Sequence, residues 1–457
     1  MNRLIKIAVS FVAAMFFFTA LGCQQTNVAT DSSAHLNSHC LPSHYVNTIH
    51  GEADLYSDLY NNCDPEIIPS PMPQPHLLTS IDTEDVLNIS PLQAAQYLTI
   101  AHTNGSDNQT NPFEAVGIDA IPYTDINHYV PSSNSGTNST LSMADVALTC
   151  DGHYVVWNKP NHPLIYLTDP RNPLTLLAWE QWYVNFANGG GLSWATYEDT
   201  ANNPYTYATP SPPCAADGFG PVTQEEWTAA EEAQEGAMQA FTGKPVIFNG
   251  LAAGYHTKMP AADALLDGPV AGGEAEVCAP YNTTEWLNQV TIEIHAVRTR
   301  KFFVCHGEDT SYGGSAQAIA FRTYQFATMM LDYDRNFTVY ESYFGVGASN
   351  LRVQPESTVV MEQPYTITIN TATDLLKPGG AYARRYAKCY VGGILIGECA
   401  AIVNPTQVAV AFPWPHRNFT HTMVLTGSGI YDGGTVSADG PAPGTSLAPN
   451  TAEVVFP

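Results

Sequence analysis

Short apolar runs alternate with helix-like stretches between residue 76 and about residue 345. Apolar runs of this length, bounded by turn residues, predict buried strands. They lie at 76–81 (HLLTSI), 116–123 (VGIDAIPY), 146–149 (VALT) or 153–157 (HYVVW), 192–197 (LSWATY), 245–250 (PVIFNG), 269–277 (PVAGGEAEV), 301–305 (KFFVC) and 337–344 (FTVYESYF).

Helix-start signals stand between these runs. Ser90-Pro91 with Gln93, Thr223 with Glu226, and Asn282 with Glu285 each combine a capping residue with a partner three positions on. Amphipathic stretches follow at 226–241 and 283–297, and another lies at 318–333. Roughly eight strands alternating with helices predict a parallel (β/α)8 TIM barrel over residues 76–350. A doubly wound open sheet is the rival, but no G-x-G-x-x-G or P-loop follows a strand.

The pattern changes beyond residue 351. Short alternating strands at 359–369, 380–391, 393–403, 407–414 and 421–427 are separated by Gly, Pro and Asn turns, with no helical pattern between them. We therefore expect a C-terminal antiparallel β-sandwich over residues 351–457.

The N-terminus has the pattern of an export signal. Arg3 and Lys6 precede an apolar segment at 7–21, and Cys23 follows small residues in a sequence that resembles a bacterial lipobox. We expect residues 1–22 to be a signal peptide, Cys23 to carry a lipid anchor to a membrane, and residues 23–75 to form a proline-stiffened tether. Cleavage without lipidation is the alternative. Because Gln24 stands where Asp would favour inner-membrane retention, the predicted location is the outer membrane or cell surface, or secretion.

Charge narrows the classes of partner. The chain has 17 basic and 43 acidic residues, a formal net charge of −26, so a nucleic-acid partner is not expected. Eight cysteines besides Cys23 permit disulfides in an oxidising compartment. Cys389 with Cys399 flanks a predicted hairpin and is the pair we expect first. Cys40–Cys63 and Cys214–Cys278 are further pairings. No C-x-x-C occurs.

Acidic and amide residues recur where the predicted strands end. In a TIM barrel these positions converge on one face, where the active site is built. They are Asp82, Glu84, Asp85, Asp125, Glu198, Asp199, Asn249, Glu274, Glu276, Glu308, Asp309 and Glu341. Paired carboxylates suit glycoside hydrolysis, which needs one acid to protonate the leaving oxygen and one carboxylate as nucleophile or base. The alternative for each acid is a helix cap or a solvated loop residue.

Other chemistries have less support in the sequence. Within residues 76–457 no His-x-x-x-His occurs, so neither a metal nor another cofactor is expected. No G-x-S-x-G follows a strand, and adjacent Cys305 and His306 would face opposite sides of a strand. Aromatic residues near strand ends are candidate sugar platforms or packing residues: Trp157, Trp194, Tyr197, Tyr205, Tyr207 and Tyr343.

The order of several segments resembles glycoside hydrolases of the α-galactosidase superfamily, in which a TIM barrel precedes a β-sandwich. The resemblance rests on YLTDPRNP (166–173), WEQWYVNFANGG (179–190), ATYEDTAN (195–202), GKPVIFNG (243–250), GGEAEVC (272–278), RKFFVCHG (300–307), FRTYQFATMMLDYD (321–334), VYES (339–342) and YARRYAKC…IGECAAIVNPT (382–406). It implies a nucleophile at the paired acids of the fourth strand and an acid/base Glu after the two glycines of the sixth.

The resemblance places the nucleophile or base at Glu198 or Asp199 and the general acid/base at Glu276. Many relatives have Asp-Asp where this chain has Glu-Asp, so the choice between the first two stays open. We expect a carbohydrate substrate whose hydroxyls are bound by Asp125, Tyr197, Asn249, Glu274 and Glu341. The alternatives are a non-catalytic glycan-binding lipoprotein and a structural surface protein on the same fold.

Overall fold

The computed structural model describes most of the chain from residue 77 onward, and all described residues belong to one compact unit, residues 38–457. The described ranges are 77–81, 91–103, 105, 107–157, 164–199, 212–251, 262–276, 278–307, 314–342, 353–366, 368–415 and 418–457. The expected signal peptide, Cys23, the tether and the Cys40–Cys63 pair lie outside them. No helix in the described ranges is long and apolar enough to cross a membrane.

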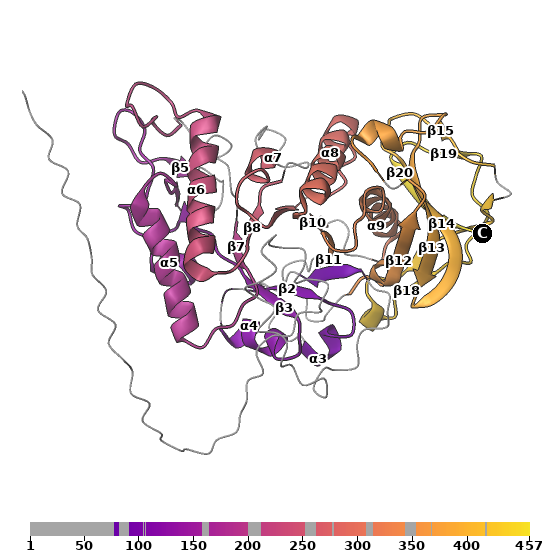
Figure 1. Cartoon of the computed structure of the whole chain (residues 1–457), viewed down its shortest axis with the longest axis horizontal. Helices are drawn as coiled ribbons and strands as arrows, with labels where there is room; N and C mark the ends of the chain where they lie inside the picture. The colour runs from indigo at the N-terminus through magenta and orange to yellow at the C-terminus, as the bar shows by residue number, and fades with distance from the viewer. Residues whose placement is uncertain are drawn as a thin grey trace, which may run out of the picture. The chain divides into compact units, whose positions relative to one another are not determined.

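Parallel strands form the first part of the fold (Figure 1). A six-stranded parallel sheet has the order β1-β11-β10-β9-β8-β7, and β2 pairs with β3 in a separate parallel ladder. The strands are β1 (Leu78–Ile81), β2 (Ile100–Thr103), β3 (Asp119–Pro122), β7 (Thr196–Glu198), β8 (Val246–Asn249), β9 (Gly272–Ala275), β10 (Phe302–His306) and β11 (Thr338–Ser342).

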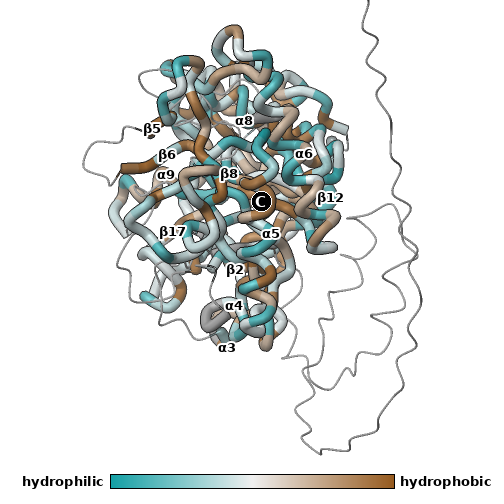
Figure 2. Tube along the Cα trace, turned by 90° about the vertical axis from the view of Figure 1, so that its left-hand side faces the viewer, coloured by the Kyte–Doolittle hydropathy of each residue, from teal (hydrophilic) through white to brown (hydrophobic). Residues whose placement is uncertain are grey.

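A few hydrogen bonds, without a continuous ladder, connect the β2–β3 pair to both edges of the six-stranded sheet. Thr99 N donates to Thr79 O at 3.0 Å beside β1, and Trp194 N donates to Ala120 O at 2.9 Å beside β7. The ladders of the described residues therefore do not close into a continuous barrel. A shared apolar cluster nevertheless joins the pair to the sheet: Ile100, Ile121, Trp194, Ala195, Tyr197, Ile247, Phe302, Val304 and Val339. In Figure 2 the trace at β8 is coloured as hydrophobic, in keeping with the complete burial of Val246, Ile247 and Phe248.

One expected parallel strand is wrong. The runs at 146–149 and 153–157 belong to an excursion in which β4 (His128–Tyr129), β5 (Val156–Trp157) and β6 (Ile165–Leu167) pair antiparallel. The parallel strand missing from the sequence prediction is β2, whose four residues were too short a run to recognise. With β2 counted, β7 is the fourth parallel strand along the chain, as the resemblance implies.

The two longest helices, α6 and α8, begin at predicted caps. Thr223 accepts from Glu226 N, and Asn282 accepts from Thr284 N and Glu285 N. The helices are α3 (Pro91–Ala94), α4 (Asp107–Glu114), α5 (Pro173–Asn188), α6 (Gln224–Thr242), α7 (Ala262–Leu265), α8 (Thr283–Thr299) and α9 (Ala316–Met329), with 3-10 turns η2 (Gly136–Ser139), η5 (Pro355–Thr358), η6 (Ala372–Leu375) and η8 (Ile430–Asp432).

The C-terminal part is antiparallel, as expected. Its main sheet has the order β12-β13-β14-β20-β16, and β15–β19 and β17–β18 are two-stranded. The strands are β12 (Val359–Pro364), β13 (Tyr382–Val391), β14 (Ile394–Asn404), β15 (Val410–Ala411), β16 (His421–Thr422), β17 (Val424–Thr426), β18 (Thr435–Ser437), β19 (Ser446–Leu447) and β20 (Thr451–Phe456). Gly392 and Gly393, both at positive φ, make the two-residue turn between β13 and β14.

Both faces of this antiparallel sheet are covered. One apolar cluster, which includes Phe412, Phe419 and Leu447, packs on one face, and α9 packs on the other (Figure 1). Arg322 of α9 forms a buried bidentate pair with Glu356, at 2.7 Å and 2.8 Å. The second layer of the expected sandwich is thus reduced to short strands and loops, because a helix takes one face of the sheet.

Three disulfides are present in the described part of the chain: Cys150–Cys214, Cys278–Cys305 and Cys389–Cys399. The hairpin pair is confirmed, and the predicted Cys214–Cys278 pair is wrong. Cys278 instead follows β9, and Cys305 lies in the neighbouring strand β10, with their Cα atoms 5.2 Å apart. The correct partners depended on strand neighbours, which the spacing of cysteines does not show.

Candidate active site

The end of β7 separates the two adjacent acids. Glu198 is completely buried, and its Oε1 accepts a hydrogen bond from Asn127 Nδ2 at 3.0 Å. Asp199 lies half-buried just beyond the strand, where Tyr123 Oη donates to its Oδ2 at 2.5 Å. Successive side chains of a strand point to opposite sides, so only one of the two acids lies with the other strand-end groups. That acid is Asp199.

Asn249, the last residue of β8, connects two strand ends. Its Nδ2 lies 2.9 Å from Asp199 Oδ1 and 3.4 Å from Glu276 Oε2. Because both oxygens contact one nitrogen, they are no more than roughly 6 Å apart. Glu276 lies in the turn after β9 and is exposed. The structure thus brings together Asp199, Asn249 and Glu276, three residues that the sequence singled out, and we call Asp199 and Glu276 the strand-end pair.

The charges around the strand-end pair disfavour ionisation of Asp199. Burial, followed by the negative charges of Asp125 and Glu276, raises the pKa of Asp199 to about 6. The hydrogen bond from Tyr123 acts in the opposite direction. Burial also raises the pKa of Glu198 to about 7, against the hydrogen bond from Asn127.

Asp125 acts on this site through its charge. Its Oδ1 accepts from His128 N at 3.1 Å, and its Oδ2 lies 3.0 Å from His128 Nδ1. Its side chain is mostly covered, with 22% exposure.

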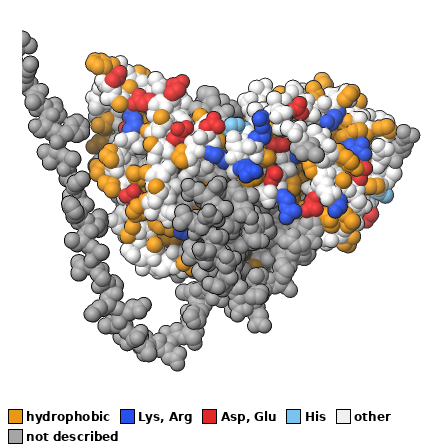
Figure 3. Space-filling model, in the orientation of Figure 1, with side chains coloured by type: hydrophobic (Ala, Val, Ile, Leu, Met, Phe, Trp, Pro, Cys, Tyr) orange, Lys and Arg blue, Asp and Glu red, His pale blue; other side chains and the backbone are white. Residues whose placement is uncertain are grey.

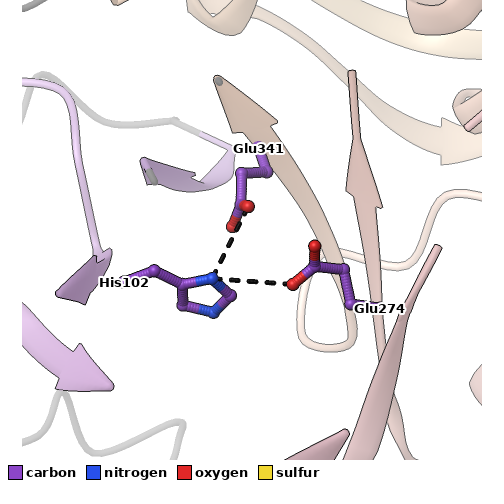
Figure 4. A group of neighbouring side chains, drawn as sticks. All are labelled: His102, Glu274 and Glu341. Carbon is purple, nitrogen blue, oxygen red and sulfur yellow. Dashed lines mark ion pairs between the residues drawn. The ribbon is translucent and has the colours of Figure 1, made fainter. Parts of the chain in front are cut away.

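A second group of side chains lies deeper between the strands. We call it the imidazole cluster: His102 of β2, Glu274 of β9, His306 of β10 and Glu341 of β11, all nearly inaccessible to solvent. His306 Nδ1 lies 2.5 Å from Glu274 Oε1, and Tyr197 Oη donates to Glu274 Oε2 at 2.9 Å. Figure 4 shows the His102 ring nitrogen directed between the carboxylates of Glu274 and Glu341.

In the imidazole cluster, the surroundings favour neutral His102 and ionised Glu274. Burial lowers the pKa of His102 to about 4, although the charge of Glu274 opposes the shift. Burial works against ionisation of Glu274 as well, but the charge and hydrogen bond of His306 hold the pKa of Glu274 below its ordinary value. Ligand atoms of His102, Glu274 and Glu341 lie within 4.8 Å of one another, the arrangement of a candidate metal site.

Two of the four residues in this cluster, His102 and His306, were not among the candidates from the sequence. His102 was overlooked because β2 was not recognised, and His306, which ends β10, was not among the candidate site residues. Both could have been found from the convergence of strand ends on one face of a barrel, if histidines had been considered together with the acids. Glu274 and Glu341, expected to bind substrate, are buried members of this cluster, and Tyr197, expected to do the same, is buried and donates a hydrogen bond to Glu274.

The remaining candidates have other surroundings. Trp194 packs edge-on against Phe302, with ring centroids 5.3 Å apart, and is therefore a core residue. Asp82, Glu84, Asp85, Tyr205, Tyr207, Glu308, Asp309 and Tyr343 lie outside the described residues. On the face drawn in Figure 3, the described Lys and Arg side chains are interspersed with Asp and Glu and do not form a continuous basic surface.

No known protein-family model and no curated protein matches this sequence. Similar solved structures include Aspergillus fumigatus Ega3 in complex with galactosamine (9% identity, TM-score 0.38, 64% of this chain and 98% of that one). The glycoside hydrolase domain of a PelA variant from Pseudomonas aeruginosa has 9% identity and a TM-score of 0.38 over 60% of this chain and 99% of that one. Bacillus licheniformis trehalose-6-phosphate hydrolase has 8% identity and a TM-score of 0.43 over 84% of this chain and 99% of that one. At this level of likeness they assign neither family nor activity.

Proposed function

We propose that this protein hydrolyses glycosidic bonds of an oligo- or polysaccharide at the strand-end pair. The observation that carries the proposal is the Asn249 amide, which contacts both Asp199 and Glu276. Two carboxyl groups on either side of a scissile bond are what glycoside hydrolysis requires. The same arrangement counts against a purely glycan-binding role, for which the two acids need no such proximity.

The surroundings of the two acids favour different roles. Asp199 is held by Tyr123 and Asn249, which fix the direction of its oxygens, so we assign it as nucleophile. Glu276 is exposed, where it can meet a leaving group and then water, so we assign it as general acid/base. Glu198 points away from both and is not assigned to the reaction.

The short separation favours retention of anomeric configuration. Retaining enzymes hold their carboxyl groups about 5 to 5.5 Å apart, whereas inverting enzymes leave about 6.5 to 9.5 Å for a water molecule. The limit of roughly 6 Å set by the shared Asn249 nitrogen lies on the retaining side. We therefore propose a glycosyl-enzyme intermediate on Asp199.

The wider architecture is part of the proposal. The eight parallel strands follow the cyclic order of a (β/α)8 barrel, and the apolar cluster shared by β2, β3, β7, β8, β10 and β11 is what its interior would hold. The three disulfides suit an exported protein. Lipidation at Cys23 and residence at the cell surface remain proposals from the sequence.

The test uses the chain without residues 1–23 and a broad panel of glycans. Wild type is expected to release reducing sugar from at least one glycan, with Glu276→Gln and Asp199→Asn each losing more than about a thousandfold in kcat/KM. Glu198→Gln is the matched control, since it neutralises the neighbouring acid and is expected to keep most of the activity. NMR of the first product should show the substrate's anomeric configuration.

Each contrary result has a definite meaning. Loss of activity in Glu198→Gln but not in Asp199→Asn would reverse the assignment of the nucleophile. An inverted first product would overturn the retaining mechanism. Glycan binding by wild type and Glu276→Gln with cleavage by neither would replace hydrolysis with glycan recognition.

A further inference from the structure

The imidazole cluster contains three potential ligands from three separate strands. His102 Nδ1 of β2 faces Glu274 Oε2 of β9 and Glu341 Oε1 of β11 (Figure 4). All three side chains are within a few per cent of complete burial. Two carboxylates directed at one imidazole nitrogen are more than a single N–H group can satisfy.

The distances are too long for direct hydrogen bonds. His102 Nδ1 lies 3.5 Å from Glu274 Oε2 and 3.6 Å from Glu341 Oε1, whereas N–H···O bonds are about 2.7 to 3.2 Å long. Ligands that surround a tetrahedral ion at about 2.1 Å are separated by about 3.4 Å. His306 Nδ1 lies 3.4 Å from Glu341 Oε1 and so has similar spacing. The two gaps at His102 are close to the spacing of ligands around one ion, and all three ligand atoms lie within 4.8 Å of one another.

The neighbours of Glu274 have the form of an outer shell. Its Oε1 is held by His306 Nδ1 at 2.5 Å, and Tyr197 Oη donates to Oε2 at 2.9 Å, which leaves the second lone pair of Oε2 directed toward His102. The His102 ring also packs against the Tyr197 ring, with centroids 4.7 Å apart. Such contacts orient ligands in metalloproteins.

The buried charges and the strand topology also favour a bound cation. A divalent cation would neutralise two carboxylates buried where water cannot screen them. The ion would also connect β2 to β9 and β11 across the interior, and β2 is the strand whose ladder is separate from the six-stranded sheet.

We propose that His102, Glu274 and Glu341 bind one divalent transition-metal ion. One imidazole nitrogen and two carboxylate oxygens with this spacing suit Zn²⁺ best, ahead of Mg²⁺ and Ca²⁺, which take oxygen ligands in larger numbers. The ion has a structural role, and it is independent of the hydrolysis proposed at the strand-end pair.

The experiment measures metal directly on the full chain without a histidine tag. After chelator treatment and dialysis against low concentrations of Zn²⁺, mass spectrometry of the metal should give about one tightly held equivalent, and the Tm should rise with metal concentration. Substitution of Co²⁺ should give the intense visible absorption of a tetrahedral nitrogen and oxygen site. Glu341→Gln should weaken binding by more than about tenfold, whereas Glu198→Gln, an equally buried carboxylate facing away, should bind as wild type does.

Several outcomes would overturn the site. These are far less than one equivalent of Zn²⁺ on wild type, unchanged affinity in Glu341→Gln, or equal loss in Glu198→Gln. If Glu341→Gln does not fold, the wild-type Co²⁺ spectrum decides, because an octahedral or absent spectrum contradicts the proposed ligands. Neither readout uses a glycan, so failure of the metal site and failure of the proposed hydrolysis are distinguishable.

Discussion

The strand-end pair and the imidazole cluster share one strand, β9, but have opposite surroundings. β9 supplies Glu274 to the cluster and is followed directly by Glu276, with only Ala275 between them. Residues two apart point to the same side, so the second acid lies one step farther along the same side. Glu274 is buried among imidazoles and a phenol, whereas Glu276 is exposed and near an amide and a carboxylate. Depth along the strand, more than residue type, separates the buried acid Glu274 from Glu276, the acid that we propose to be reactive.

The largest expected effect is on stability. Glu274→Ala leaves His306 and Tyr197 without their buried partner, so the free energy of unfolding should fall by about 3 to 5 kcal/mol. Glu276→Ala should change it by less than about 0.5 kcal/mol, because that side chain is exposed. Urea unfolding of both variants makes the comparison. Equal losses of unfolding free energy in the two variants would mean that burial does not distinguish Glu274 from Glu276.

The next effect concerns the pH dependence of stability. Burial raises the pKa of Glu198 to about 7, so between its unfolded value near 4.5 and pH 7 the folded state holds a proton that the unfolded state has lost. Its contribution is therefore most favourable below pH 4.5 and declines as pH rises through 7. Glu198→Gln should remove this decline. The free energy of unfolding of the variant, compared with that of wild type, should therefore be about 1 to 3 kcal/mol more favourable at pH 8 than at pH 4. The measurement is chemical unfolding of both proteins between pH 4 and pH 8. If wild type and variant lose stability in parallel as pH rises, burial of Glu198 is not the cause of the decline.

A smaller effect is expected from the residue that positions Asp199. Tyr123→Phe removes the hydrogen bond to Oδ2, so kcat/KM should fall by about 10- to 100-fold, and the acid limb of its pH profile should move above about pH 6. Tyr154→Phe, which changes an exposed tyrosine, is the control. A lower rate with an unmoved acid limb would point to a loss of packing instead.

The smallest effect tests the charge of Asp125. Its negative charge is one reason that the pKa of Asp199 lies near 6, so Asp125→Asn should shift the acid limb of kcat/KM to lower pH by less than about one unit. The asparagine keeps an oxygen for His128 N. A shift to higher pH would show that Asp125 acts mainly through His128.

Local patterns predicted much of this molecule. Caps at Thr223 and Asn282 and the two glycines of the β13–β14 turn depend on residues close in sequence, and the structure has them as expected. The Cys389–Cys399 pair followed from the same hairpin. Acids after strands could also be listed in advance, because parallel strands end at one edge of a sheet.

The sequence by itself thus determined the alternation of strands and helices, the antiparallel C-terminal part and the set of candidate acids. Only the tertiary structure decided that Asp199 and not Glu198 shares the Asn249 amide with Glu276, that His102 and His306 lie beside the buried acids, and that Cys278 pairs with Cys305. Capping, turns and hydrophobic period act over a few residues and can be read along the chain. Which face a strand presents, and which distant strand lies beside it, depends on packing among residues far apart in sequence.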